Sequence, residues 1–495
     1  MSFVINLYSH SYSYEIAMTS QNKDYRLKVS ITHDKRTTGN ILCEVYLPKK
    51  ITDPVELIFH PTSEQSNQLG WPFEFSVCGK IKDFSGQLET TIEANKVYFE
   101  QGPTKHWGHE LSESLLIGEP VDLTITNFLK HDKHKKENPP IKGIFWLTPN
   151  IMLSPVKSLS HSFTGETTVR NIRNFEFVLD NGCCLKFDHY YRYLENDDGD
   201  TVSFAELVAE FEIDHKNEEI LSFESIDDFL MLTSFSARQR CVCLGWEIYE
   251  PSKITKFYRR DITIPEIKKN HSFRDTLIDI CDFEEFIKTA YKNFIKTNKK
   301  NLLRQAIHRA IGRENSTLES KYLTLYSALE TIVLFYRQNH GLEFIISLAE
   351  WDVFKKDVKR FINKHPQFSE NKGKRKLIYE KLPELNRVSF ATAFTHFCEN
   401  YNIDLQDLWP VVDRRDGISL SDIRNKLIHG DTFRRRQERA LMSAVEHLRW
   451  IVERSILSVL GWPYSKSKVS NSFLSKNMTM YREWPRDRSI LSEPD

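Results

Sequence analysis

Arg424 and His429 are the two residues of this 495-residue chain whose types and spacing best suit chemistry on a phosphate ester. The guanidinium of arginine carries a fixed charge and can donate two parallel hydrogen bonds to phosphate oxygens. Histidine titrates near neutrality, so it can accept or donate a proton. The pair suits RNA cleavage in which the 2′-OH attacks the adjacent phosphorus and leaves a 2′,3′-cyclic phosphate. Such a step needs no metal ion, and DNA, which lacks the 2′-OH, should not react.

The segment 417–431 (GISLSDIRNKLIHGD) predicts a short helix that carries both side chains. Ser419 and Asp422 have the spacing of a capping box, which favours a helix start. Gly430 suits the left-handed residue that ends a helix. The apolar stripe of this helix consists of Leu420, Ile423 and Leu427.

Helix geometry separates the two candidate side chains. Positions five apart differ by about 140° in direction and by about 7.5 Å in height. We therefore expect Arg424 on the flank of the apolar stripe and His429 facing away from it. Two copies of the chain around a two-fold axis could line one cleft with two arginines and two histidines.

The spacing by itself is weak evidence. With 17 histidines, and arginine at about one residue in twenty, about one Arg-x₄-His match is expected by chance. The sequence has a second match, Arg360 and His365, in which Pro366 disfavours a helical conformation of His365. A histidine in the last turn of a helix is also favoured by the helix dipole alone.

The stretch Arg424-Asn425-x₃-His429-Gly430, which follows a helical segment containing Leu329–Val333, resembles the HEPN superfamily of ribonucleases and nucleotide-binding bundles. The resemblance covers roughly residues 280–460. The order of domains looks like that of the ApeA group of anti-phage, abortive-infection proteins. It implies that Arg424, Asn425 and His429 are catalytic, that Glu330 supports them, and that the protein is a homodimer or a higher even oligomer. It also implies that a phage-derived trigger, expected to be a protein, acts on the N-terminal domain.

Two alternatives stay open for this motif. Arg424 and Glu330 could form a structural ion pair that pins two helices together, whether or not they also take part in catalysis. The whole module could instead be a non-catalytic HEPN-type bundle that holds a nucleotide or a partner.

Basic residues near the motif are candidates for RNA binding. Residues 266–495 contain 40 Lys and Arg against 30 Asp and Glu, whereas residues 1–265 contain 28 against 38. A basic half joined to an acidic half predicts that one half handles a polyanion, although solvated surface would look similar. The candidates for RNA contacts are Arg414, Arg415, Lys426, Arg434, Arg435 and Arg436.

The wider chain reads as an α+β multidomain protein. Residues 1–265 contain short runs rich in aromatic and β-branched residues, such as 141–147, which predict a sandwich-like β domain. The resemblance implies a sensor or regulatory function for this domain. One helix is expected within it, at 225–234. Apolar periodicity in residues 272–463 predicts an all-α bundle with helices at 282–295, 302–311, 317–336 and 432–460, and the resemblance implies that this bundle is HEPN-like. Residues 464–495 are polar, and we expect a tail or a segment that docks on another surface.

Several function classes are disfavoured. No stretch approaches the roughly 20 apolar residues of a membrane span, and the N-terminus lacks the pattern of a signal peptide, so a cytoplasmic protein that needs no membrane is expected. The close cysteine pairs, 183/184 and 241/243, lack zinc-ligand spacing, so we expect them to pack in the core. There is no Gly-x-Ser-x-Gly motif and no phosphate-binding glycine loop. The chemistry of Arg424 and His429 together with the resemblance predicts an endoribonuclease without metal or cofactor that cuts cellular RNA, with tRNA as one candidate.

Overall fold

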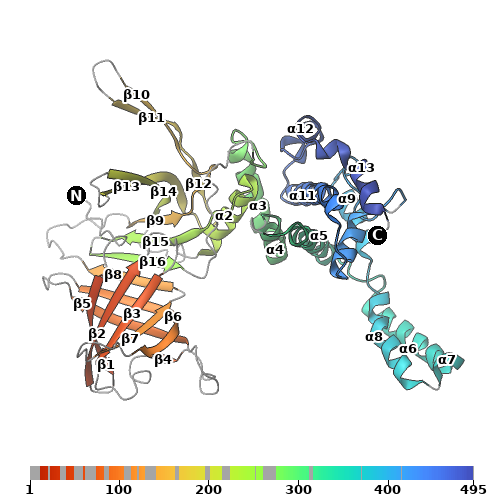
Figure 1. Cartoon of the computed structure of the whole chain (residues 1–495), viewed down its shortest axis with the longest axis horizontal. Helices are drawn as coiled ribbons and strands as arrows, with labels where there is room; N and C mark the ends of the chain where they lie inside the picture. The colour runs from red at the N-terminus through yellow and green to blue at the C-terminus, as the bar shows by residue number, and fades with distance from the viewer. Residues whose placement is uncertain are drawn as a thin grey trace. The chain divides into compact units, whose positions relative to one another are not determined.

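A computed structural model describes residues 12–20, 23–33, 41–48, 60–61, 74–82, 89–104, 113–119, 122–128, 141–161, 167–195, 201–213, 223–250, 252–259, 275–311, 316–369, 371–413 and 415–493. A β-rich N-terminal region is followed by a helical C-terminal region, so the chain is α+β (Figure 1). It forms two compact units, Met1–Leu230 with Cys241–His271, and Met231–Arg240 with Ser272–Asp495. The boundary between them falls inside helix α2 (Phe223–Ala237).

Six of the first eight strands of the N-terminal unit form a closed ring. These strands are β1 (Tyr12–Ser20), β2 (Lys23–His33), β3 (Ile41–Pro48), β4 (His60–Pro61), β5 (Glu74–Lys82), β6 (Glu89–Thr104), β7 (Glu113–Glu119) and β8 (Asp122–Phe128). Pairing runs β6-β7-β3-β2-β1-β5, and β5 pairs again with β6, so six strands close into a ring. The long strand β6 closes the ring by pairing with β5 through residues 89–98 and with β7 through residues 98–104, and its residues 89–95 also pair with β8.

The remaining strands extend the same sheet beyond β8. They are β9 (Ile141–Leu147), β12 (Glu176–Val178), β13 (Cys184–Glu195), β14 (Thr201–Ile213), β15 (Cys243–Tyr249) and β16 (Lys253–Arg259). Their order is β12-β13-β14-β9-β15-β16-β8, and all described pairs are antiparallel. A separate hairpin consists of β10 (Val156–His161) and β11 (Thr167–Arg173) (Figure 1). The expected sandwich-like domain is thus one continuous sheet with a closed portion and not two separate sheets.

Helix α2 supplies part of the core of the N-terminal unit. Phe229 is fully buried, and its ring lies 4.7 Å from that of Phe177 and 5.6 Å from that of Phe187. The predicted strand at 141–147 and the helix around 225–234 are confirmed. Cys241 and Cys243 are both buried free thiols, as their alternation predicts.

The C-terminal unit consists of helices. They are α3 (Phe283–Lys296), α4 (Lys300–Ile311), α5 (Leu318–His340), α6 (Leu348–Lys364), α7 (Pro366–Ser369), α8 (Lys372–Leu385), α9 (Phe390–Asn400), α10 (Leu420–Ile428), α11 (Glu438–Val459), α12 (Asn471–Asn477) and α13 (Met480–Ser492), with short 3₁₀ turns η3 (Arg435–Gln437) and η4 (Tyr464–Lys466). Helix α5 is central, since it packs against α4, α9, α10 and α11. None of the helices that the structure describes is long and apolar enough to cross a membrane.

Local sequence explains the limits of the central helix. The side chain of Thr317 caps the N-terminus of α5 by accepting a hydrogen bond from the Ser320 backbone N–H, and Gly341 ends the helix with a φ of 65°. The interior of α5 is buried on several sides, which indicates a helix surrounded by neighbours.

The predicted helices at 282–295, 302–311 and 317–336 are confirmed as α3, α4 and α5. The predicted helix at 432–460 begins later, at Glu438, because residues 435–437 form a 3₁₀ turn first. Helices α6 to α9 were not predicted; α6, α7 and α8 pack around a small core of Trp351, Ile362 and Leu382. Within the segment 464–495, expected to be a tail or a docking segment, α13 packs against α11.

Candidate functional site

The motif helix α10 has the local structure that its sequence predicts. Ser419 and Asp422 form a reciprocal capping box at its N-terminus. Leu420 and Ile423 are fully buried, whereas Leu427 is only half-buried. Gly430 follows the helix with a φ of 88°, a conformation that glycine adopts without strain.

Arg424 lies in the middle of α10 and is held from two sides. Its Nη2 donates a hydrogen bond to Oε1 of Glu330 on α5 at 3.2 Å, and its Nη1 donates to Oδ1 of Asn425 at 3.1 Å. The Arg424 side chain is 32% exposed and that of Glu330 41% exposed. Water can therefore reach the ion pair, which limits its contribution to stability to about 1 kcal/mol or less.

Two hydrogen bonds leave most of the Arg424 donors available. A guanidinium has five N–H groups, and only two of them are used by Glu330 and Asn425 among the residues that the structure describes. The side-chain amide of Asn425 uses its oxygen for Arg424, so its NH₂ group can donate elsewhere. The arrangement offers hydrogen-bond donors next to a positive charge, which is suited to an oxyanion such as phosphate.

His429 lies at the end of the same helix. It is the C-cap residue of α10, with φ −79° and ψ 0°, and its side chain is exposed. Its backbone N–H donates to the carbonyl of Asn425 at 3.0 Å. Asn425 and His429 are one helical turn apart, and Asn425 also accepts from Arg424. Asn425 therefore links Arg424 and His429, whose side chains point in different directions on an ideal helix.

The basic residues expected to bind RNA differ in their surroundings. Arg415 is 86% exposed and makes an ion pair with Asp413, and the hydrogen bonds from Arg415 lower the pKa of that carboxyl to about 2. Arg436 lies 3.4 Å from Glu493 of the segment that follows α13. Arg434 caps the turn η3, and it and Arg435 are exposed.

Two further candidates need separate mention. The ammonium of Lys426 lies 6.0 Å from the ring centroid of Phe433, in the loop between His429 and η3. Arg414 lies outside the described residues.

Helix α13 contacts the chain on both sides of the motif. Before α10, the guanidinium of Arg488 donates hydrogen bonds to the carbonyls of Asp413, Gly417 and Ile418 at 2.7, 2.9 and 3.0 Å. After α10, the carbonyl of Ile490 accepts a hydrogen bond from the side chain of Gln437 at 3.2 Å. The segment 464–493 thus takes part in positioning the motif.

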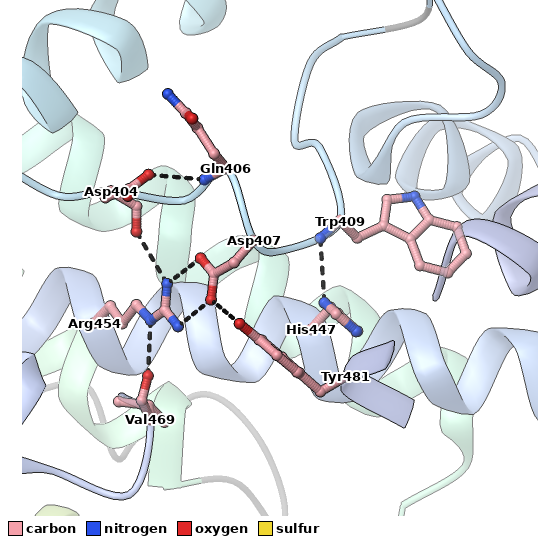
Figure 2. A network of polar contacts seen from close by, with 8 residues as sticks. All are labelled: Asp404, Gln406, Asp407, Trp409, His447, Arg454, Val469 and Tyr481. Carbon is pink, nitrogen blue, oxygen red and sulfur yellow. Dashed lines mark hydrogen bonds and ion pairs between the residues drawn. The ribbon is translucent and has the colours of Figure 1, made fainter. Parts of the chain in front are cut away.

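A buried polar network fixes the loop that leads to α10 (Figure 2). Arg454 of α11 has a fully buried side chain, and it donates two hydrogen bonds to Asp407 at 2.6 and 2.7 Å. The hydroxyl of Tyr481 on α13 donates to the same carboxylate at 2.8 Å. The network connects α11, α13 and the loop around 404–409 (Figure 2).

His447 of α11 continues this network as a neutral imidazole. Its Nδ1 accepts from the Trp409 backbone N–H at 3.2 Å, so Nε2 must carry the proton that it shares with the Met480 carbonyl at 3.2 Å. Burial is the main reason that the pKa of His447 is lowered, to about 4. Both ring nitrogens of the buried His447 are used in structural hydrogen bonds, whereas the side chain of His429 is exposed.

The second Arg-x₄-His pair has a different geometry. His365 is the C-cap residue of α6 with an extended ψ of 128°, as the following proline predicts. Arg360 is 70% exposed and pairs with Asp357 of its own helix at 2.9 Å. Arg424 thus pairs with an acidic residue of another helix, Glu330, whereas Arg360 pairs with one three residues away on its own helix.

Sequence reasoning missed the residues that hold the motif. Tyr322 and Tyr326 precede Glu330 at intervals of four, so the same face of α5 carries all three. This spacing could have been read from the sequence. Nothing in the sequence indicated that Arg488 contacts the chain before α10, since 70 or more residues separate it from the carbonyls that it holds.

Comparison with protein-family models, with curated proteins and with solved structures finds no match to this chain. The case for a function therefore depends on the residues and on their arrangement.

Proposed function

We propose that the protein is an endoribonuclease of the HEPN type whose active site contains Arg424, Asn425 and His429. The observation that carries the proposal is the partly exposed Arg424, held by Glu330 and Asn425 at 3.2 and 3.1 Å, five residues before an exposed His429. In this proposal the unused guanidinium and amide donors bind the scissile phosphate. His429 acts as the acid or base for the 2′-OH reaction, and Glu330 orients Arg424.

Two copies of the chain would form the complete site. Asn425 brings the Arg424 side chain part of the way towards the His429 face, and a second copy would supply the other pair. Apolar side chains flank the charged residues: Ile428, just before His429, is 52% exposed, and Leu334, one turn after Glu330, is 37% exposed. Burial of such side chains against a second copy would favour a dimer.

The biological role that we propose is defence against phage by abortive infection. The β-rich unit would respond to a phage-derived trigger, expected to be a protein, and the helical unit would then cut cellular RNA, with tRNA as a candidate. Arg434 and Arg435, exposed shortly after His429, would contact RNA phosphates. The acidic N-terminal half could restrain the basic half until the trigger binds.

Cleavage by the purified full-length chain tests this proposal. A short RNA and the same RNA with 2′-deoxy nucleotides would be incubated with the wild type, His429→Ala and Arg424→Ala. We expect His429→Ala to slow cleavage by about 10²–10⁴-fold, and the products to end in 2′,3′-cyclic phosphate. His365→Ala and Arg360→Ala, from the other Arg-x₄-His pair, are matched controls and should cut like the wild type.

Two results would overturn the ribonuclease proposal. One is cleavage by His429→Ala at the wild-type rate, with thermal unfolding showing both proteins folded. The other is equal cleavage of the 2′-deoxy substrate, since the reaction requires the 2′-OH. A wild-type protein that binds RNA or a nucleotide but does not cut, with or without phage lysate as a source of trigger, would favour the non-catalytic HEPN-type module.

A further inference from the structure

One face of helix α5 packs along α10 and carries three regularly spaced polar side chains. Tyr322, Tyr326 and Glu330 are spaced by four residues and lie along the same side of the helix. The hydroxyl of Tyr322 donates to the Leu420 carbonyl at 2.6 Å, and that of Tyr326 lies 2.8 Å from Oγ of Ser421. Glu330 accepts from Arg424. The first contact holds the start of α10, and the last holds its arginine.

The proton of each hydroxyl can be assigned. Ser421 has a single hydroxyl proton, which it donates to the Val411 carbonyl at 2.7 Å. Tyr326 must therefore donate to Ser421. Burial raises the pKa of Tyr326, so the phenol stays protonated and keeps this bond at neutral pH.

The ring of Tyr326 is also held by two aromatic neighbours. The Tyr322 ring stacks against it with centroids 6.4 Å apart and an interplanar angle of 16°. Phe390 of α9 lies 5.8 Å away on a tilted ring. A phenol held by one hydrogen bond and two aromatic neighbours has little freedom to rotate.

This fixed ring faces the arginine of the motif. The guanidinium carbon of Arg424 lies 5.8 Å from the centroid of the Tyr326 ring, within the range of a cation–π interaction. A long arginine side chain held by Glu330 alone could swing about that contact. The ring restricts the guanidinium from a second direction.

We propose that Tyr326 is a positioning residue that orients Arg424 for the RNA phosphate through the face of its ring, an inference that rests on the proposed function. Glu330, Asn425 and the Tyr326 ring then occupy separate parts of the guanidinium, and its remaining N–H groups face the ligand. Tyr322, one turn earlier, serves only the helix start and the stacking.

Three variants of the full chain separate the ring from the hydroxyl. Tyr326→Leu removes both, Tyr326→Phe removes the hydroxyl and keeps the ring, and Tyr322→Phe removes an equivalent hydroxyl that does not touch Arg424. Binding of a fluorescent RNA with 2′-deoxy nucleotides, which cannot be cut by the proposed reaction, would be measured by anisotropy. The kcat and KM for the normal RNA would be measured in parallel.

We expect Tyr326→Leu to weaken binding by about two- to fivefold, the range of one partly exposed cation–π contact. Its kcat should fall further, because displacement of a charged group by about 1 Å can cost up to 10²-fold. Tyr326→Phe and Tyr322→Phe should bind within about twofold of the wild type. In the Arg424→Ala background, Tyr326→Leu should have no additional effect on binding.

Two outcomes overturn the positioning role. If Tyr326→Phe loses as much binding as Tyr326→Leu, the hydroxyl is responsible and not the ring. If Tyr326→Leu weakens binding equally in the Arg424→Ala background, the residue acts through general structure. A wild type that binds the RNA without cutting it disproves the proposed nuclease alone, and the binding cycle still decides the role of Tyr326. A wild type that neither binds nor cuts RNA overturns both.

Discussion

Removal of the Arg488 side chain should loosen α10 while the rest of the helical unit stays folded. Arg488 is 5% exposed, and its three hydrogen bonds end on the carbonyls of Asp413, Gly417 and Ile418. Gly417 and Ile418 directly precede Ser419, the first residue of the capping box, and Asp413 lies six residues before it. In Arg488→Ala they would lose a charged donor in a place that water reaches poorly.

The size of the effect follows from these contacts. A hydrogen bond to a charged group contributes about 1.5–3 kcal/mol, and three that share one guanidinium are not additive. We therefore expect a loss of roughly 3–5 kcal/mol in the local stability of the motif. Because 1.4 kcal/mol is a factor of ten, amides of α10 should exchange about 10²–10³-fold faster.

Hydrogen exchange read by mass spectrometry over residues 413–430 measures this directly, with peptides of α4 and α5 as internal references. Arg486→Ala is the matched control, since Arg486 lies on the same helix but is exposed. If the proposed function holds, RNA cleavage by Arg488→Ala should fall with the loss of α10 protection. Unchanged exchange in 413–430, or equal acceleration in all helices, would refute a specific role for Arg488 at the motif.

Two other predictions concern the buried network of Figure 2. Asp407→Asn leaves the fully buried Arg454 without its counter-charge, and it should lower the free energy of unfolding in urea titrations by about 3–5 kcal/mol. Asp404→Asn is the control and should change this free energy little, because only the backbone carbonyl of Asp404 contacts Arg454. A loss below 1 kcal/mol for Asp407→Asn would contradict this. The pKa of His447 in the folded protein is lowered to about 4 from an ordinary 6.5, so the unfolded chain takes up this proton at a higher pH than the folded chain does. The neutral imidazole therefore contributes its full stability above pH 6.5, and this contribution is lost as the pH falls towards 4. The loss should reach roughly 3 kcal/mol, and a His447→Gln variant should show a flatter dependence in this window; an equally steep curve would assign the loss to other groups.

Local sequence predicted the motif helix well because its determinants are local. The capping box of Ser419 and Asp422 and the left-handed Gly430 each depend on residues within one or two turns. The same holds for the strand at 141–147, where a run of seven residues rich in aromatic and β-branched side chains was sufficient. By contrast, the start of α11 was placed too early, because the chain forms a 3₁₀ turn at 435–437 that apolar periodicity does not reveal.

The sequence alone also named Arg424 and His429 as candidates for chemistry. Their spacing is shared by Arg360 and His365, so the choice depended on the capped helix and on the resemblance carried by Asn425 and Gly430. The sequence named Glu330 as a partner only by resemblance, and the tertiary structure brings the Glu330 carboxylate to 3.2 Å from Arg424. Tertiary structure alone decided how the strands of the β unit join into one sheet with a closed ring, because pairing between strands far apart in the chain has no local signal. It also decided that Tyr326 faces Arg424 and that Arg488 holds the residues before α10. These contacts join segments from 70 to nearly 100 residues apart, and their geometry depends on how whole helices pack, which no short window of sequence contains.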